Sequence, residues 1–152
     1  MAEDTPAAGS EEWGVLLTAH AVLVEQMERR LAQAGLPSLA WYDALWALER
    51  SPGQRLRLSE FEQWMVISRS NITRLVDRLE DAGLARRERS DEDRRGAFAV
   101  LTAEGRKMRK RMWTVYEPAI GALFNAPLTA AERAQVGVIG RKLLKAARGD
   151  AG

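Results

Sequence analysis

The sequence has no cysteine and a single histidine, His20. Without thiols the chain can form no disulfide or thiolate metal site, and one imidazole cannot make a histidine cluster. We therefore expect no metal and no cofactor. Paired catalytic carboxylates, a nucleophile beside a base and a phosphate-binding glycine loop are also missing, so we do not expect an enzyme.

Long apolar stretches are absent as well, because no run approaches the roughly 18 residues that cross a bilayer. The segment from Met1 to Glu12 is acidic and lacks the basic-then-apolar order of a signal peptide. We expect a soluble, cytoplasmic protein, associated with the nucleoid if it binds DNA. The formal net charge is only +2, so affinity for nucleic acid must come from where the charges lie.

What is present is a balanced composition, with 46% hydrophobic and 29% charged residues in a chain of 152, which indicates one globular domain. Apolar residues at helical spacing predict a first helix over about 11–34, ended by Gly35. Ser38 can cap a second helix, which ends before Ser51 and turns inward Trp41, Ala44, Leu45 and Leu48.

Two further helices are separated by only a few residues. The first begins at Ser59, followed three residues later by Glu62 in the form of a capping box, and ends near Trp64. The second is capped by Ser68, stops at Gly83 and turns inward Ile72, Leu75, Val76 and Leu79. So short a turn predicts a helix-turn-helix.

Two short strands, 84–89 and 97–101, flank a polar loop that ends in Gly96 and predict a hairpin. Thr102 can cap a long helix to about residue 124, which Pro118 should kink. A second capping box at Thr129 opens the last helix, with Val136, Ile139, Leu143 and Ala147 on one stripe. The predicted fold is mainly α with a small β-hairpin wing.

The outward face of the helix after Ser68 changes in charge along its length. Its first two turns carry Ser70, Asn71, Thr73 and Arg74, which suit base edges and phosphates, whereas Asp77 and Asp81 would repel a phosphate backbone. Only its N-terminal end is then suited to enter a DNA groove. An ordinary amphipathic surface helix stays open as the alternative, and Arg78 fits either DNA or an ion pair with a nearby acid.

The hairpin tip carries Arg94 and Arg95 beside Asp93. Arginine enters minor grooves, and an adjacent carboxylate can hold it in position. A solvated charged turn is the alternative. The helix after Ser68 and the hairpin tip both carry basic residues suited to DNA, and they follow each other within one short segment. We therefore favour DNA binding over a chance arrangement of charges.

The run from Ser68 to Glu80, then Gly83-Leu84, Asp91 to Arg95 and Leu101 to Gly105, resembles the signature of the MarR (multiple antibiotic resistance regulator) family. The resemblance covers about 11–147. It implies a dimeric winged helix-turn-helix protein that binds a pseudo-palindromic operator, usually near its own promoter. It further implies frequent release from DNA by a small aromatic or phenolic ligand.

Carried over residue by residue, the resemblance places the recognition-helix contacts at Ser68, Arg69, Ser70, Asn71, Thr73 and Arg74. In the wing it makes Arg95 the minor-groove arginine, Asp93 its brace and Arg94 a phosphate contact. The family's effector crevice lies between the dimer helices and the winged unit, so its candidate wall is His20, Trp41, Tyr42, Trp46, Met108, Met112 and Trp113. The alternative is that these are plain core residues, with His20 a hydrogen-bonded core histidine.

The apolar stripes of the terminal helices predict a homodimer, because the small winged unit cannot cover them, and Gly137 and Gly140 permit close helix approach. A monomeric helical core is the alternative. We expect a disordered arm at 1–10, dimerisation helices at 11–34 and 103–147, a winged helix-turn-helix at 38–101 and a disordered tail at 148–152.

The sequence thus predicts a sequence-specific transcription regulator that represses by occupying a promoter as a homodimer on double-stranded DNA. A small ligand would shift the spacing of the two recognition helices and release it. Two alternatives stay open: a DNA-binding dimer without an effector, and a winged-helix module for protein interaction. Activation in place of repression is also open.

Overall fold

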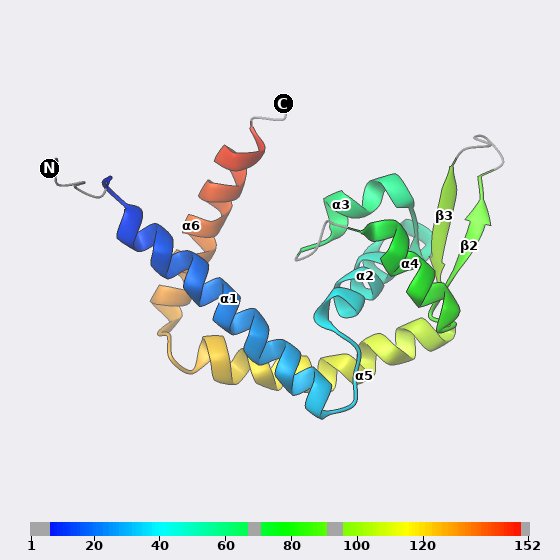
Figure 1. Ribbon diagram of the computed structural model, residues 1–152, viewed down its shortest axis with the longest axis horizontal. Coiled ribbons are helices and arrows are strands. Elements are labelled where there is room, and N and C mark those ends of the chain that lie inside the picture. The colour runs from blue at the N-terminus through cyan, green and yellow to red at the C-terminus, as the bar shows by residue number, and fades with distance from the viewer. Residues whose placement is uncertain (1–6, 67–70, 91–95, 150–152) are drawn as a thin grey trace, which may run out of the picture. The chain divides into compact units, whose positions relative to one another are not determined.

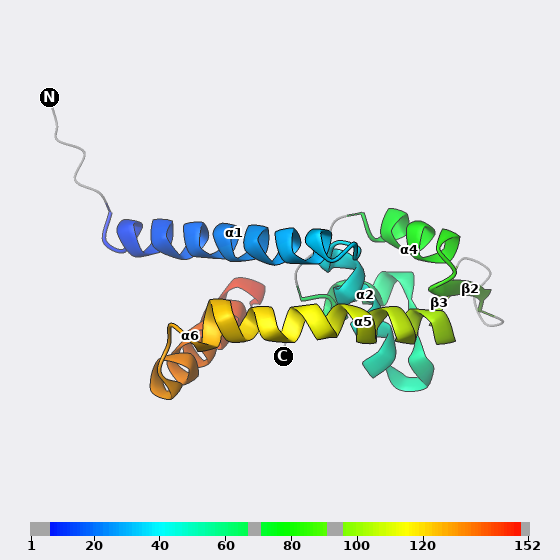
Figure 2. The ribbon, with the colours of Figure 1, turned by 90° about the horizontal axis from the view of Figure 1, so that it is seen from below.

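The computed structural model describes residues 7–66, 71–90 and 96–149. The chain divides into two units, Met1–Tyr116 and Glu117–Gly152, and each is described by itself. In Figure 1 the first unit runs from the blue α1 through most of the yellow α5, and α6 in the second unit is orange to red. Figure 2 shows α1 leading into α2.

The first unit carries the winged fold. Its elements are, in order, α1 (Ser10–Gln33), α2 (Leu39–Arg50), η1 (Pro52–Gln54), β1 (Arg55–Arg57), η2 (Leu58–Glu60), α3 (Phe61–Trp64), α4 (Ile72–Asp81), β2 (Ala85–Arg89), β3 (Ala97–Leu101) and the greater part of α5 (Ala103–Ile120). The second unit holds the end of α5, a π-helical turn η3 (Gly121–Asn125) and α6 (Ala130–Arg148). The predicted mainly α fold with a small β wing is confirmed.

Glycines end two of the helices as predicted. Gly35 has φ 68° and Gly83 has φ 74°, the left-handed conformation that glycine adopts without strain. In each case the next N–H returns to the helix: Leu36 donates to the carbonyl of Leu31 at 2.9 Å, and Leu84 donates to that of Leu79 at 2.9 Å. These are the bonds of a Schellman cap, and they turn the chain sharply after α1 and after α4.

The sheet has three antiparallel strands in the order β1-β3-β2, one strand more than predicted. Ala99 of the central strand pairs with Leu56 on one side and with Arg87 on the other. Leu56 and Ala99 are buried, and α2 and α4 pack against the sheet. The core between these layers contains the fully buried Phe61, Leu45, Leu48, Val76 and Leu79.

A close backbone contact joins the hairpin to the next helix. The Thr102 hydroxyl accepts the N–H of Gly105 at 3.0 Å, which confirms the predicted cap, and donates to the Gly83 carbonyl at 2.7 Å. A Cβ at Gly105 would lie 2.1 Å from the Leu84 carbonyl oxygen. Only glycine therefore fits at this point, where α5 begins against the start of β2.

The predicted capping box at Ser59 is wrong in its position. The carboxylate of Glu60 accepts the N–H of Arg57 at 3.1 Å, so the bond from carboxylate to backbone is made two residues earlier than the pattern suggested. A 3₁₀ turn over Leu58–Glu60 consequently precedes the short α3. The helical segment begins earlier than predicted because Glu60, and not Glu62, accepts the backbone N–H at its start.

In the second unit the capping box at Thr129 is confirmed. The hydroxyl accepts the N–H of Glu132 at 3.2 Å, and the carboxylate of Glu132 accepts the N–H of Thr129 at 2.8 Å. Pro118 lies inside α5, and the helix continues as the π-turn closed by the N–H of Ala126 on the carbonyl of Gly121 at 2.8 Å. The long helix therefore ends at Asn125, close to the predicted position.

None of the helices in the described part of the chain is long and apolar enough to cross a membrane.

Candidate nucleic-acid interface

The second helix of the helix-turn-helix, α4, begins at Ile72. Asn71 precedes it in a left-handed conformation, with φ 57°, which asparagine tolerates better than most residues. The predicted contacts Ser68, Arg69 and Ser70 lie outside the described residues, as does the predicted Ser68 cap. Of the predicted recognition surface, the structure therefore describes Asn71 and the first turns of α4.

The two faces of α4 are divided as predicted. Leu75, Val76 and Leu79 are buried, and Ile72 is half-buried against the core. Asn71, Thr73 and Arg74 are all exposed. Those three side chains offer an amide, a hydroxyl and a guanidinium, which suit base edges and phosphates.

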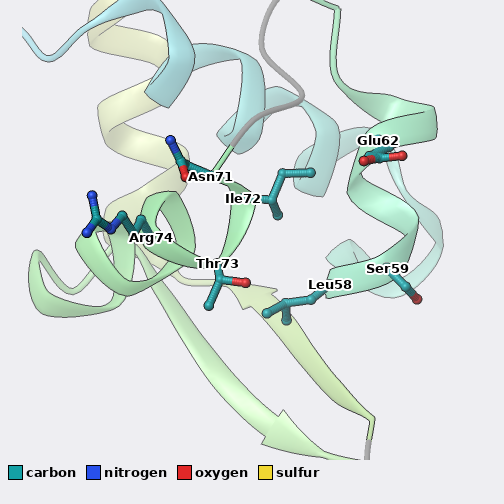
Figure 3. Close-up of a pocket in the computed structure, with 7 residues that line it drawn as sticks. All are labelled: Leu58, Ser59, Glu62, Asn71, Ile72, Thr73 and Arg74. Carbon is teal, nitrogen blue, oxygen red and sulfur yellow. The ribbon is translucent and has the colours of Figure 1, made fainter.

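An open groove of about 540 Å³ lies between α3 and the start of α4. Its lining is Leu58, Ser59, Glu62, Asn71, Ile72, Thr73 and Arg74 (Figure 3). Figure 3 shows Arg74 and Glu62 at opposite ends of the groove, so its positive end lies on the recognition helix. A phosphate is attracted to that end and repelled from the carboxylate at the other.

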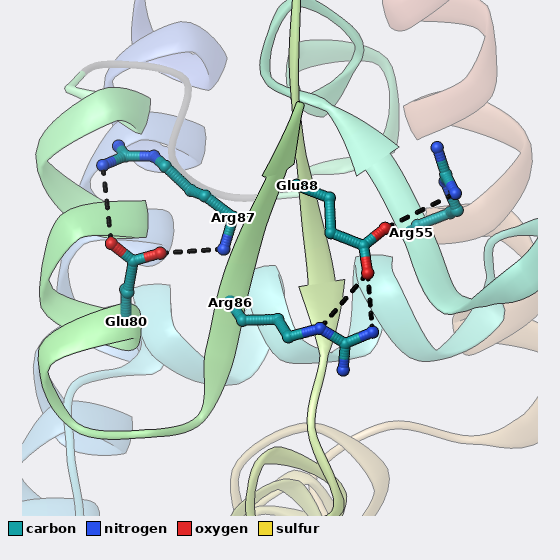
Figure 4. Close-up of polar contacts among 5 residues, drawn as sticks. All are labelled: Arg55, Glu80, Arg86, Arg87 and Glu88. Atoms are coloured by element: carbon teal, nitrogen blue, oxygen red, sulfur yellow. Dashed lines mark hydrogen bonds and ion pairs between the residues drawn. The ribbon is translucent and has the colours of Figure 1, made fainter. Parts of the chain in front are cut away.

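Arg87 of β2 pairs with two carboxylates on the acidic side of α4. Its guanidinium lies 2.5 Å from a carboxylate oxygen of Asp77 and 3.8 Å from one of Glu80. The N–H of Arg87 also donates to Glu80 at 2.8 Å, as Figure 4 shows. This cluster ties the wing to α4 and reduces the repulsion that Asp77 would exert on DNA. Sequence reasoning missed Arg87, because its partners lie on another element.

Arg78 does not take the structural role that the sequence left open for it. Two of its proposed partners, Asp77 and Glu80, pair with Arg87 instead. Arg78 is exposed and makes no ion pair within the described part of the chain.

The outer face of the sheet is also basic and rigidly braced. The guanidinium of Arg55 lies 3.8 Å and that of Arg57 4.7 Å from the ring centre of Phe98, in cation–π geometry. Glu88 accepts from Arg86 at 2.7 Å and lies 3.6 Å from Arg55 (Figure 4). The hydrogen bond from Arg86 lowers the pKa of the Glu88 carboxyl, which keeps this carboxylate ionised.

The tip of the wing, with Asp93, Arg94 and Arg95, lies outside the described residues. Below it the hairpin is closed by the N–H of Ser90 on the carbonyl of Gly96 at 3.1 Å. Full pairing of β2 with β3 from Ala85 to Arg89 then brings the hairpin back to α4.

A buried carboxylate at Asp43 positions the end of α3. The side chain is only 3% exposed, and its two oxygens accept the N–H of Val66 at 3.0 and 2.8 Å. Since Val66 follows α3 closely, this carboxylate fixes the end of α3 to α2. The sequence signal that could have found it is a carboxylate between inward-facing residues, in Tyr42-Asp43-Ala44.

The aromatic residues predicted to wall a ligand crevice come together only in part. Tyr42 is buried, stacks on Trp113 at 6.0 Å between ring centres and meets Tyr116 edge-on at 4.8 Å. Burial raises the pKa of both tyrosines. Tyr116 was missed by the sequence prediction.

The other predicted pocket residues are dispersed. Met112 is fully buried and Met108 packs against the core, whereas Trp46 is exposed beneath the guanidinium of Arg109. Trp41 lines a different cleft, between α2 and α4. His20 is exposed on α1, so the prediction of a core histidine is wrong, because the apolar stripe that carries it is uncovered in the single chain.

Comparison with known proteins gives a consistent result. The MarR family model matches residues 34–96. The transcriptional repressor MprA of Escherichia coli is 31% identical over 122 residues, covering 80% of this chain and 68% of MprA. Sco3205, a MarR family transcriptional regulator from Streptomyces coelicolor solved in complex with DNA, has a TM-score of 0.87 at 28% identity, covering 97% of this chain and 93% of that one.

A second regulator of that family from Streptomyces coelicolor, AbsC, has a TM-score of 0.83 at 27% identity. The superposition covers 96% of this chain and 98% of AbsC. The likeness therefore extends over both units of the chain.

Proposed function

Since the chain belongs to the MarR family of DNA-binding transcription regulators, we propose that it represses transcription as a homodimer bound to a pseudo-palindromic operator. A small aromatic or phenolic ligand releases it. The observation that carries the proposal is the division of α4, which buries Leu75, Val76 and Leu79 and exposes Asn71, Thr73 and Arg74 beside the wing.

The DNA contacts proposed are the recognition set and the wing. Asn71, Thr73 and Arg74 meet bases and phosphates in the major groove, together with Ser68, Arg69 and Ser70. Arg95 enters the minor groove, braced by Asp93, and Arg94 meets a phosphate. The pairing of Arg87 with Asp77 and Glu80 supports this docking, because it reduces the negative charge beside the proposed recognition face.

A second copy of the chain is proposed to cover the terminal helices. Large apolar side chains are exposed on α1 and α6, at 61% for Trp13 and 54% for Ile139. The other exposed apolar side chains on these helices are Val15, Leu16, Leu17, Val22, Leu23, Val136, Val138, Leu143 and Leu144. A monomer rarely leaves so many large apolar side chains exposed. Two winged units joined in this way would read half-sites about 34 Å apart.

Repression is proposed because MprA, a relative that matches 80% of this chain, is a transcriptional repressor, and a dimer occupying a promoter excludes polymerase sterically. Release by a ligand requires preferential binding to the conformation that does not fit DNA. To shift the ratio of released to DNA-binding conformation from 1:99 to 99:1, the ligand must bind the released conformation roughly ten-thousand-fold more tightly. The aromatic side chains of Tyr42, Trp113 and Tyr116 support an aromatic ligand, since rings stack on rings.

The test starts with the selection of bound fragments from the source genome by the full-length protein. Arg74→Ala and Arg95→Ala should each weaken binding to a selected fragment, and affinity should fall steeply with salt. Unchanged affinity in both variants would favour a protein-interaction module.

Light scattering at micromolar concentration should give the mass of a dimer, and a monomer would remove this mechanism. Titration of benzoic acids and phenols into the preformed complex should release DNA. If no member of that series does so, the second candidate, a DNA-binding dimer without an effector, takes its place.

A further inference from the structure

A second cleft shares Asn71 and Arg74 with the groove described above. It has a volume of about 200 Å³ and separates the start of α2 from the exposed side of α4. Its lining is Ser38, Ala40, Trp41, Asn71, Arg74, Leu75 and Arg78. Two of these residues, Asn71 and Arg74, also belong to the proposed DNA-reading face, so the cleft continues that surface.

The cleft is positively charged. Among the described residues that line it, Arg74 and Arg78 are the ionisable ones, and they are four positions apart, on one face of the helix. Two like charges at that spacing repel each other. Neither is compensated by an ion pair with a described residue, because Asp77 and Glu80 turn to Arg87. An anion seated between the two guanidinium groups would remove this repulsion.

The opposite wall offers a hydroxyl donor. Ser38 occupies the position before α2, but its side chain makes no capping bond to the helix, and the residue is exposed. The first N–H of α2, on Leu39, is already taken at 2.9 Å by the carboxylate of Glu28, which does not line the cleft. The Ser38 hydroxyl thus stays available to a ligand in the cleft.

A polar cleft with two arginines and a serine suits a phosphate, which binds guanidinium in forked geometry and accepts from hydroxyls. We propose that it holds a backbone phosphate of the operator, with Arg78 and Ser38 as positioning residues that α2 and α4 present together. The inference rests on the proposed function, because it places the phosphate beside bases read from Asn71 and Arg74. We call Ser38 and Arg78 the phosphate clamp. These two side chains fix the depth and angle at which α4 enters the groove, and they read no base themselves.

The proposal is tested with full-length protein, a duplex selected from random sequence by the wild type, and an unrelated duplex of equal length. Arg78→Gln should weaken binding to both duplexes by a similar factor, about 10-fold. It should also reduce the slope of log affinity against log salt by about 0.9, the value for one phosphate contact. Ser38→Ala should lower the DNA affinity by about 3-fold. Arg78→Lys should restore the salt slope of the wild type, because it keeps the positive charge. Lys142→Gln, an exposed charge on α6, is the matched control and should leave both quantities unchanged.

A scan with single methylphosphonates separates contact from folding. Each methylphosphonate removes one backbone charge from the duplex. At one position in each half-site this change should lower the affinity of the wild type but cause no further loss of affinity in Arg78→Gln. A variant that had merely lost structure would still respond at every position.

An unchanged salt slope in Arg78→Gln, or a methylphosphonate profile identical to that of the wild type, would overturn the clamp. If Arg74→Ala still weakens binding in that case, the proposed DNA-reading face stands and only this inference fails. If Arg74→Ala is also without effect, the proposed function fails with it.

Discussion

The winged helix-turn-helix, here called the winged unit, buries most of its apolar side chains, whereas the terminal helices α1 and α6 expose most of theirs. In the winged unit Phe61 and Leu79 are completely buried, and the exposed face of α4 is polar. On α6 no described residue is buried, and on α1 burial is confined to Met27 and Leu31 in the last two turns. The winged unit therefore buries most of its apolar residues within one chain, whereas most of those on the terminal helices are left for the proposed second copy to cover. The predictions below test that difference.

The largest effect is expected when charge is placed on the exposed stripe of α6. Ile139→Lys with Leu143→Lys should cost dimerisation about 4 kcal/mol, because ammonium groups would be buried without partners. The variant should sediment as a monomer at micromolar concentration, with the far-UV spectrum of the winged unit retained. Lys142→Gln serves as the control, and a variant that remains dimeric would contradict a role for this stripe.

A glycine in each region gives the next contrast. Gly105→Ala should destabilise the winged unit by about 3 kcal/mol, because the new Cβ would meet a backbone carbonyl that cannot move aside. Gly140 has nothing within 4 Å of its ideal Cβ, so Gly140→Ala should stabilise α6 in a monomer by about 0.5–1 kcal/mol. Urea unfolding measures both. In the dimer Gly140→Ala should weaken association instead, and equal effects in dimer and monomer would argue against close helix approach there.

Within the winged unit, loss of Arg87 should weaken DNA binding more than it affects stability. Arg87→Ala exposes Asp77 and Glu80 beside the recognition face, and we expect about 10-fold lower affinity, which corresponds to about 1.4 kcal/mol. The pairs are partly solvated, so the change in unfolding free energy should stay below about 1 kcal/mol. Adding Asp77→Asn and Glu80→Gln should restore most of the binding. If it does not, Arg87 acts by holding the wing rather than by neutralising charge.

The smallest effect concerns Tyr42 and Tyr116. Burial raises the pKa of both phenols above the usual 10.0, so the folded protein retains protons that the unfolded chain releases. Their contribution to stability is therefore complete below pH 10 and is lost as pH rises through their folded pKa values. Tyr42→Phe with Tyr116→Phe should flatten the alkaline fall in unfolding free energy measured in urea, and an unchanged fall would assign it to other groups.

Periodicity and caps were enough to predict most of the fold. The stops at Gly35 and Gly83 and the caps at Thr102 and Thr129 are local signals, since each depends on residues within a few positions. β1 was missed because Arg-Leu-Arg is too short for a strand pattern and is stabilised by pairing with β3, more than forty residues away along the chain.

The candidate site was predictable in its residue types but not in its pairings. The exposed residues at the start of α4 follow from the helical period. By contrast, the partner of Asp77 depends on how β2 lies against α4, and the burial of Asp43 depends on where α3 ends. Tyr42 proved more buried than Trp41 because Trp113 and Tyr116 of α5 cover it, a contact between distant segments.

The backbone contact at Gly105 has a mechanical consequence. The first turn of α5 rests on the carbonyl of Leu84, and Thr102 is bonded to Gly83, so no compressible side chain separates the helix from the hinge of the wing. α5 has 18 residues and is about 27 Å long. Within the first unit the start of this helix therefore lies directly against the backbone that leads into β2, so a shift of this end of α5 would displace the hairpin as well.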